Sequence, residues 1–173
     1  MASPQGDDAR CTRAAEVRLI RDAAGTAGIQ AEFHVPAPAD LLLELLWNVD
    51  NFPELFPDIK SYDVLRSSDA SVDVAFRVNA VVKELRYVLR RELSTDTAEI
   101  RWSSLSGDLR KISGGWSLRP TATANVTLAV YRTFVDPGRM IPSRLVAAAA
   151  KRQAQILAQR VREVAVRRCD PGC

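Results

Sequence analysis

The sequence predicts an α+β domain in which a curved, seven-stranded antiparallel sheet wraps around a long C-terminal helix, with two short helices after the first strand. Three observations indicate this fold. From position 59 apolar residues alternate with polar ones over about seventy residues, short polar turns interrupt the alternation, and a glycine-free stretch with helical spacing then covers 140–167. A sheet of this kind has one face to bury, and the terminal helix is the one long element that can cover it.

The first strand is expected at 28–35, GIQAEFHV, where every second residue is apolar. A shorter alternating piece, EVRLI, precedes it at 16–20, but GIQAEFHV is the better strand and is the one expected in the sheet. PAPAD ends the strand, and LLLELLWN at 41–48 predicts the first short helix.

A proline-fenced passage, WNVDNFPELFPDIKSYDVL, covers residues 47–65. Pro53 and Pro57 stand four positions apart, with Phe52 and Phe56 beside them. We expect a short helix here that plugs one end of the curled sheet, either as a structural stopper or as the lid of a cavity.

The turns SSDAS, VKE, STDT, SGD and TATA divide the remaining strands. The expected strands are 59–67, 71–81, 84–94, 97–105, 109–119 and 124–135. DPG ends the last of them, and the proline of the helix that follows lies in its first turn, where a helix tolerates it.

The length of 173 residues fits one domain, expected at 15–168 between flexible tails at 1–14 and 169–173. All three cysteines lie near the ends of the chain, which favours a reducing compartment over a disulfide framework. The N-terminus lacks an apolar leader segment, and no apolar run approaches the ~20 residues of a membrane span. A cytoplasmic protein is therefore expected.

Three stretches resemble the START-like (SRPBCC) superfamily, most closely its polyketide cyclase/dehydrase and lipid-transport (coenzyme Q-binding-like) branch. VPAPADLLLELLWNVDNFPELFPDIKSYDVL resembles the strand–helix–proline opening of that branch, with Asp50, Pro53 and Pro57 as matching positions. IRWSSLSGDLRKISGGWSLRP resembles its paired strands ending in G-x-W, and NVTLAVYRTF resembles its last strand. The three stretches span roughly residues 28–165.

The resemblance implies the helix-grip fold and a hydrophobic cavity between the sheet and the long helix. It does not fix the ligand, because the superfamily includes carriers, cyclases, ubiquinone-binding proteins and ribosome-associated proteins. A polyketide, a quinone or a lipid-like molecule would suit such a cavity.

Two arginines stand in the apolar phase of their strands: Arg91 in 84–94 and Arg132 in 124–135. Either each bends to solvent or pairs with a carboxylate such as Glu92 or Asp136, or one or both project into a cavity. In a cavity a guanidinium would bind a carboxylate or hold a polarised carbonyl oxygen.

Tyr87 shares the inward phase of Arg91, and Ser104 shares that of Trp102 on the neighbouring strand. Arg91, Arg132, Tyr87 and Ser104 are therefore the catalytic candidates of a site that would need no metal or nucleophile. Apolar and aromatic residues in the inward phase, together with residues of the long helix, are the ligand-binding candidates. They are Trp47, Phe52, Phe56, Phe76, Val78, Leu89, Trp102, Val130, Phe134, Ala149, Gln153 and Ile156.

Other catalytic signatures are missing from the sequence. His34 is the single histidine, lies on the polar face of its strand and is expected to be solvated. The chain has no pattern typical of a metal site or of a Ser-His-Asp triad. No cofactor is expected.

Basic residues dominate the C-terminal helix and the turn before it. They are Arg139, Arg144, Lys151, Arg152, Arg160, Arg162, Arg167 and Arg168, against Glu163 alone. Besides a solvated face, this surface would suit an acyl carrier protein or an anionic membrane surface. Nucleic acid is not expected as a partner, because no exposed aromatic platform accompanies the charge.

Two functions compete at this stage. One is a cofactor-free polyketide cyclase, aromatase or dehydratase, and the other is a non-catalytic lipid or quinone carrier. A third reading, an interaction protein that docks an acidic partner through the basic helix, needs no cavity. At least two polar side chains converging inside the cavity would favour an enzyme over a carrier.

Overall fold

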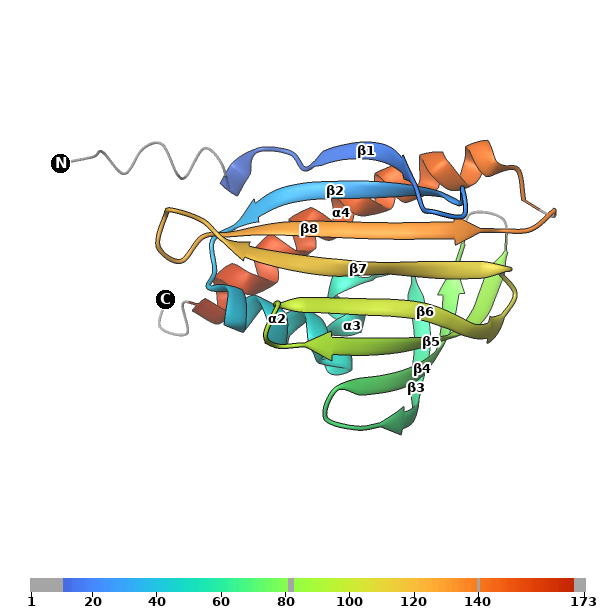
Figure 1. Ribbon diagram of the computed structural model, residues 1–173, viewed down its shortest axis with the longest axis horizontal. Coiled ribbons are helices and arrows are strands. Elements are labelled where there is room, and N and C mark those ends of the chain that lie inside the picture. Colours follow the sequence, from blue (N-terminus) through green and yellow to red (C-terminus); the bar gives the residue numbers. More distant parts are fainter. Residues whose placement is uncertain (1–10, 81–82, 140, 170–173) are drawn as a thin grey trace.

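One antiparallel sheet of eight strands forms the body of the protein, in the order β1-β2-β8-β7-β6-β5-β4-β3 (Figure 1). The computed structural model describes residues 11–80, 83–139 and 141–169. The strands are β1 (Glu16–Arg21), β2 (Ala27–Val35), β3 (Ile59–Ser67), β4 (Ser71–Asn79), β5 (Glu84–Ser94), β6 (Glu99–Gly107), β7 (Lys111–Pro120) and β8 (Thr127–Asp136). The predicted α+β helix-grip architecture is confirmed, and the ends of both expected tails, 1–10 and 170–173, lie outside the described residues.

The eighth strand is β1, so the predicted count of seven is one too low. This six-residue strand pairs with β2 at the edge of the sheet, where Glu16 lies opposite Glu32. The alternation of apolar and polar residues is weak in β1 because an edge strand buries few side chains. Leu19 is 71% exposed, whereas Ala15, just before the strand, is buried in the core.

Strands β6 and β7 begin two residues later than the sequence predicted. The turn between β5 and β6 takes up residues 95–98, and Ala98 adopts a left-handed backbone with φ of 49°. Because side-chain preference gives no sign of this conformation at an alanine, the hydrophobic pattern placed the strand too early.

The long helix α4 (Ser143–Cys169) crosses the inner face of the sheet and packs against β2 and β1 (Figure 1). From Ala154 onward it carries the buried residues Ala154, Leu157, Ala158, Val161, Val164 and Ala165. Its first half is less covered, and Leu145 is 51% exposed. Among the described residues, none of the helices combines the length and apolarity that crossing a membrane requires.

The two expected short helices follow β2. Helix α2 (Ala39–Trp47) buries Leu42, Leu43, Leu45 and Leu46, and a 3₁₀ turn, η1 (Val49–Asn51), leads into α3 (Phe52–Leu55). The buried Asn51 side chain donates a 2.8 Å hydrogen bond to the carbonyl oxygen of Leu45, which fixes the angle between these helices. Phe52 then stands against Phe56 and Phe76, with ring centroids 5.6 Å apart in each pair. The proline-fenced helix thus closes one end of the curved sheet.

Candidate functional site

A cavity of about 690 Å³ lies between the inner face of the sheet and the first half of α4. Strands β4 to β8 form one wall, α3 closes one end, and α4 forms the opposite wall. The volume lies within the range of about 300–1,000 Å³ that is typical of small-molecule sites. The cavity arises because α4 packs against β1 and β2, which leaves the curved β4–β7 part of the sheet standing away from the helix.

The walls are mainly apolar and aromatic. The predicted ligand-binding residues that line the cavity are Phe52, Phe56, Phe76, Val78, Leu89, Trp102, Ala149, Gln153 and Ile156. Trp47, Val130 and Phe134 are not among the lining residues. Trp116 is 3% exposed and packs on Tyr131 with a centroid distance of 4.7 Å.

Arg91 is a buried charge at the α3 end of the cavity, with 4% exposure. Its guanidinium donates hydrogen bonds of 2.6 Å to the carbonyl oxygen of Leu46 and 2.8 Å to that of Trp47. It also lies over two rings, 5.0 Å from the centre of Trp47 and 4.6 Å from that of Phe52. The last carbonyls of a helix lack partners within the helix, so Arg91 caps the C-terminus of α2 while it lines the cavity.

The charge of Arg91 has no carboxylate partner among the described residues. Burial lowers the pKa of its guanidinium to about 9, so the group remains protonated at neutral pH. A guanidinium has five N–H donors, and two of them are used on the helix carbonyls. Among the described residues, no hydrogen bond within the protein uses the other three.

Two tyrosines bring hydroxyl groups into the same cavity. Tyr87 was predicted, whereas Tyr131 on β8 was missed. Burial raises the pKa of Tyr87, with a smaller contribution from the nearby Tyr131 hydroxyl. Burial also raises the pKa of Tyr131 to about 12. Both hydroxyls are therefore protonated at neutral pH and are able to donate.

Ser104 does not line the cavity. Its hydroxyl oxygen accepts a 3.0 Å hydrogen bond from the main-chain N–H of Ile112. The β6–β7 pairing ends one residue earlier, at Ser103 and Ser113, so Ser104 satisfies a main-chain donor where the ladder stops.

The expected inward orientation of Arg132 is wrong. The exposed Arg132 side chain lies on the outer face of the sheet with Val130 and Phe134, and Nε donates a 2.5 Å hydrogen bond to Gln30. The inner face of β8 carries Ala129, Tyr131, Thr133 and Val135 instead. Both phases of this strand are largely apolar, so the alternation does not decide between them. The pairing with β2 decides it, because core residues Ala31 and Phe33 lie opposite Tyr131 and Ala129.

The mouth of the cavity is polar. Gln153 on α4 donates to the carboxylate of Asp58, which lies just before β3, and both line the cavity with Lys83 and Arg152. Asp58 and Lys83 were not singled out from the sequence, because loop residues carry no phase that indicates where they point.

Several cations of α4 have partners within the protein. Arg162 donates a 2.8 Å hydrogen bond to the carbonyl oxygen of half-buried His34, Arg167 pairs with Glu54, and Arg168 bonds Asn51. Exposed cations remain at Arg144, Lys151, Arg152 and Arg160. Docking of an acidic protein or a membrane on this face stays a prediction.

Residues 35–162 match the family described as polyketide cyclase/dehydrase and lipid transport. The chain belongs to this family. The resemblance to the START-like superfamily is thereby confirmed, and the cavity lies within the matched residues. A comparison with curated proteins gave no match.

Solved structures of the START superfamily share the fold. The Zhui aromatase/cyclase from Streptomyces sp. R1128 is 21% identical with a TM-score of 0.72, over 89% of this chain and 96% of that one. A STAR-related lipid transfer protein from Xanthomonas axonopodis is 17% identical with a TM-score of 0.74, over 90% and 95%. Human StAR-related lipid transfer protein 5 is 9% identical with a TM-score of 0.76, over 92% and 86%. At these identities the likeness concerns the fold.

Proposed function

We propose that the protein binds a hydrophobic molecule with oxygen substituents, of the polyketide type, and promotes its cyclisation or dehydration without a metal or organic cofactor. One observation carries the proposal. Arg91, Tyr87 and Tyr131 bring hydrogen-bond donors into a cavity that is otherwise mainly apolar. A carrier of purely apolar cargo would need no hydrogen-bond donors in its cavity beyond the two that Arg91 uses to cap α2.

The donors suit a reaction in which negative charge develops on oxygen. In an intramolecular aldol step, an α-carbon gives its proton to water and forms a bond to a ketone carbon, while the carbonyl π electrons move to the ketone oxygen, which then takes a proton from water. Dehydration afterwards removes this hydroxyl and a second hydrogen of the α-carbon as water and leaves a C=C bond. Arg91 and a tyrosine hydroxyl would stabilise the oxygen while the apolar walls hold the chain folded.

A second candidate function is a non-catalytic lipid or quinone carrier. Asp58 is the one carboxylate among the described lining residues, and it already accepts a hydrogen bond from Gln153 at the mouth. No carboxylate therefore stands inside the cavity as a base. Binding alone would require only the apolar walls and an anchor for one oxygen.

Product analysis with a synthetic poly-β-ketone separates the two functions. An enzyme accelerates formation of cyclised products over buffer, and Tyr87→Phe and Tyr131→Phe lower that rate roughly tenfold or more while binding persists. Tyr62→Phe is the matched control, because its hydroxyl lies outside the cavity and bonds Asp50 at 3.2 Å. Binding without any acceleration would identify a carrier.

A further inference from the structure

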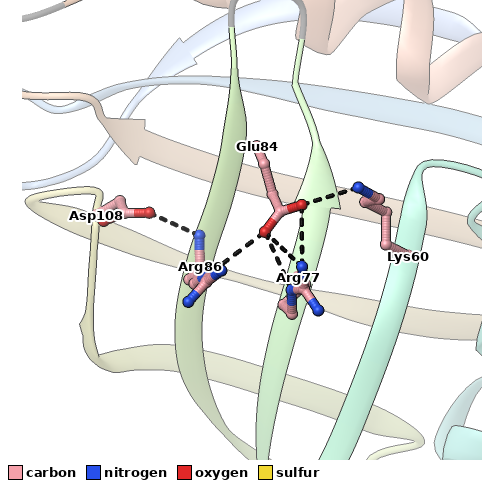
Figure 2. A network of polar contacts seen from close by, with 5 residues as sticks. All are labelled: Lys60, Arg77, Glu84, Arg86 and Asp108. Carbon is pink, nitrogen blue, oxygen red and sulfur yellow. Dashed lines mark hydrogen bonds and ion pairs between the residues drawn. The ribbon is translucent and has the colours of Figure 1, made fainter.

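A cluster of three cations surrounds a single carboxylate on the outer face of the sheet, away from the ligand cavity (Figure 2). Glu84 on β5 accepts from Lys60 Nζ at 2.9 Å, Arg77 Nε at 3.0 Å and Arg86 Nε at 3.3 Å. The cations come from three neighbouring strands, β3, β4 and β5. The β4–β5 register sets Arg77 directly opposite Arg86, an arrangement of like charges that is unfavourable unless anions compensate it.

The cluster does not neutralise itself. Three cations against one carboxylate leave two positive charges. Hydrogen bonds from Lys60 and Arg77 lower the pKa of Glu84 to about 2. Glu84 is therefore ionised at neutral pH, and the net charge of the cluster includes its negative charge. Asp108 accepts a 2.8 Å bond from the main-chain N–H of Arg86, and among the described residues no ion pair joins it to the side chains of the three cations (Figure 2).

Other ion pairs on this face are balanced one to one. Arg90 makes two 2.8 Å hydrogen bonds to Asp73, and Arg101 bonds Glu99 at 2.7 Å. The Lys60–Arg77–Arg86 cluster differs from these pairs, because it sets three cations against one carboxylate.

The cluster retains donors that solvent reaches. The side chains of Lys60 and Arg77 are each 47% exposed, and that of Arg86 is 69% exposed. Among the described residues, neither terminal nitrogen of Arg86 has a hydrogen-bond partner. Lys60 uses one of its three N–H donors on Glu84.

We propose that Lys60, Arg77 and Arg86 form a binding site for a phosphate group. A phosphate monoester carries about −1.5 to −2 charges at neutral pH and offers three oxygens, which match the two uncompensated charges and the converging donors. The planar fork of an arginine suits such oxygens. A carboxylate ligand would carry only one negative charge, about half that of a phosphate monoester.

The site lies beside the entrance of the cavity. Lys83, which precedes Glu84, and Asn79, which pairs with Glu84 across the strands, both line the cavity. A phosphate bound by the cluster would thus be held next to the mouth on the outer side of the same two strands. It belongs either to a soluble phosphate monoester or to a lipid whose headgroup is a phosphate monoester.

Isothermal titration with inorganic phosphate and with glycerol 3-phosphate, at ionic strength held constant with sodium chloride, tests the site. Wild-type protein should bind saturably. Arg77→Gln and Arg86→Gln should each weaken binding roughly tenfold, and Glu84→Gln should strengthen it. Arg90→Gln is the matched control from a balanced pair and should leave the affinity unchanged. If Arg77→Gln does not fold, Lys60→Gln at the start of β3 takes its place.

Equal affinity of the wild type and the cluster variants for phosphate would overturn the proposal, as would a wild-type response that chloride reproduces. Vesicles then identify the source. Sedimentation with vesicles that contain phosphatidic acid, whose headgroup is a phosphate monoester, assigns the phosphate to a lipid headgroup if the same substitutions abolish it and phosphatidylcholine vesicles show none. Saturable phosphate binding without vesicle binding assigns it to a soluble compound. Because the cavity is untouched, these results are independent of the proposed enzymatic function.

Discussion

The guanidinium of Arg91 on β5 donates a 2.8 Å hydrogen bond to the carbonyl oxygen of Trp47 and lies 5.0 Å from the centre of that residue's ring. The two residues are 44 positions apart in the chain. The contact joins the cavity wall to the end of α2, from which the chain turns into the short helix that closes the cavity. The charged candidate for ligand binding is therefore also a structural cap.

This dual role predicts that Arg91→Ala lowers stability as well as activity. Two carbonyls of α2 would lose their partner in a buried region, which costs on the order of 3 kcal/mol, in addition to the lost contact with two rings. Urea unfolding of the variant measures the loss. Arg91→Lys, which keeps the charge with fewer directed donors, should fall between the variant and the wild type.

The matched control is Arg132→Ala on the outer face. Its exposed side chain bonds an uncharged partner, Gln30, so we expect a change within about 1 kcal/mol. A native unfolding midpoint for Arg91→Ala would show that the helix carbonyls do not depend on the guanidinium.

Alkaline titration should reveal the buried tyrosines. The pKa of Tyr131 is about 12 and that of Tyr87 lies above the ordinary value of 10. Because the unfolded chain loses these protons near pH 10 and the folded protein keeps them, stability falls as pH rises from 10 toward 12. Tyr131→Phe should make this fall less steep in thermal melts recorded across that range. Phenolate absorbance that grows at pH 10 in folded Tyr62→Phe protein, which retains Tyr87 and Tyr131 alone, would contradict the placement.

Glu84 predicts a pH effect at the acid end. Its carboxyl has a pKa of about 2 in the folded protein, below the ordinary 4.5, so its contribution to stability is complete above pH 4.5 and is lost as pH falls toward 2. Glu84→Gln should melt at a lower temperature than the wild type at pH 7, and the difference should shrink as pH falls through this window. Melting curves with a constant difference from pH 7 to pH 2.5 would count against the network in Figure 2.

The inward face of β5 was predictable because its two faces differ in kind. Leu85, Tyr87 and Leu89 alternate with Glu84 and Arg86, so the apolar phase is unambiguous. In β8 both phases hold apolar residues, and only its pairing with β2 across the sheet decides that Tyr131 faces inward. The misplacement of Arg132 and the omission of Tyr131 have this one cause.

The hydrogen-bond partners of Arg91 could not be predicted from the sequence, for another reason. A search for its counter-ion considers carboxylates, such as Glu92 or Asp136, whereas the structure uses the carbonyls of Leu46 and Trp47. Every residue has a carbonyl, so no residue type identifies it as a partner. The overall architecture needed no such detail, since strand alternation and one long apolar helix stripe determine it.

Ligand binding in the cavity is the central claim, and a cavity-filling substitution tests it most directly. Ala149 lines the cavity, whereas its neighbour Ala148 is exposed and does not. The dissociation constant of 1-anilinonaphthalene-8-sulfonate, measured by fluorescence, should be unchanged in Ala148→Trp and at least about tenfold weaker in Ala149→Trp, whose indole occupies the apolar space. Equal binding by both folded variants and the wild type would contradict a ligand site between the sheet and α4.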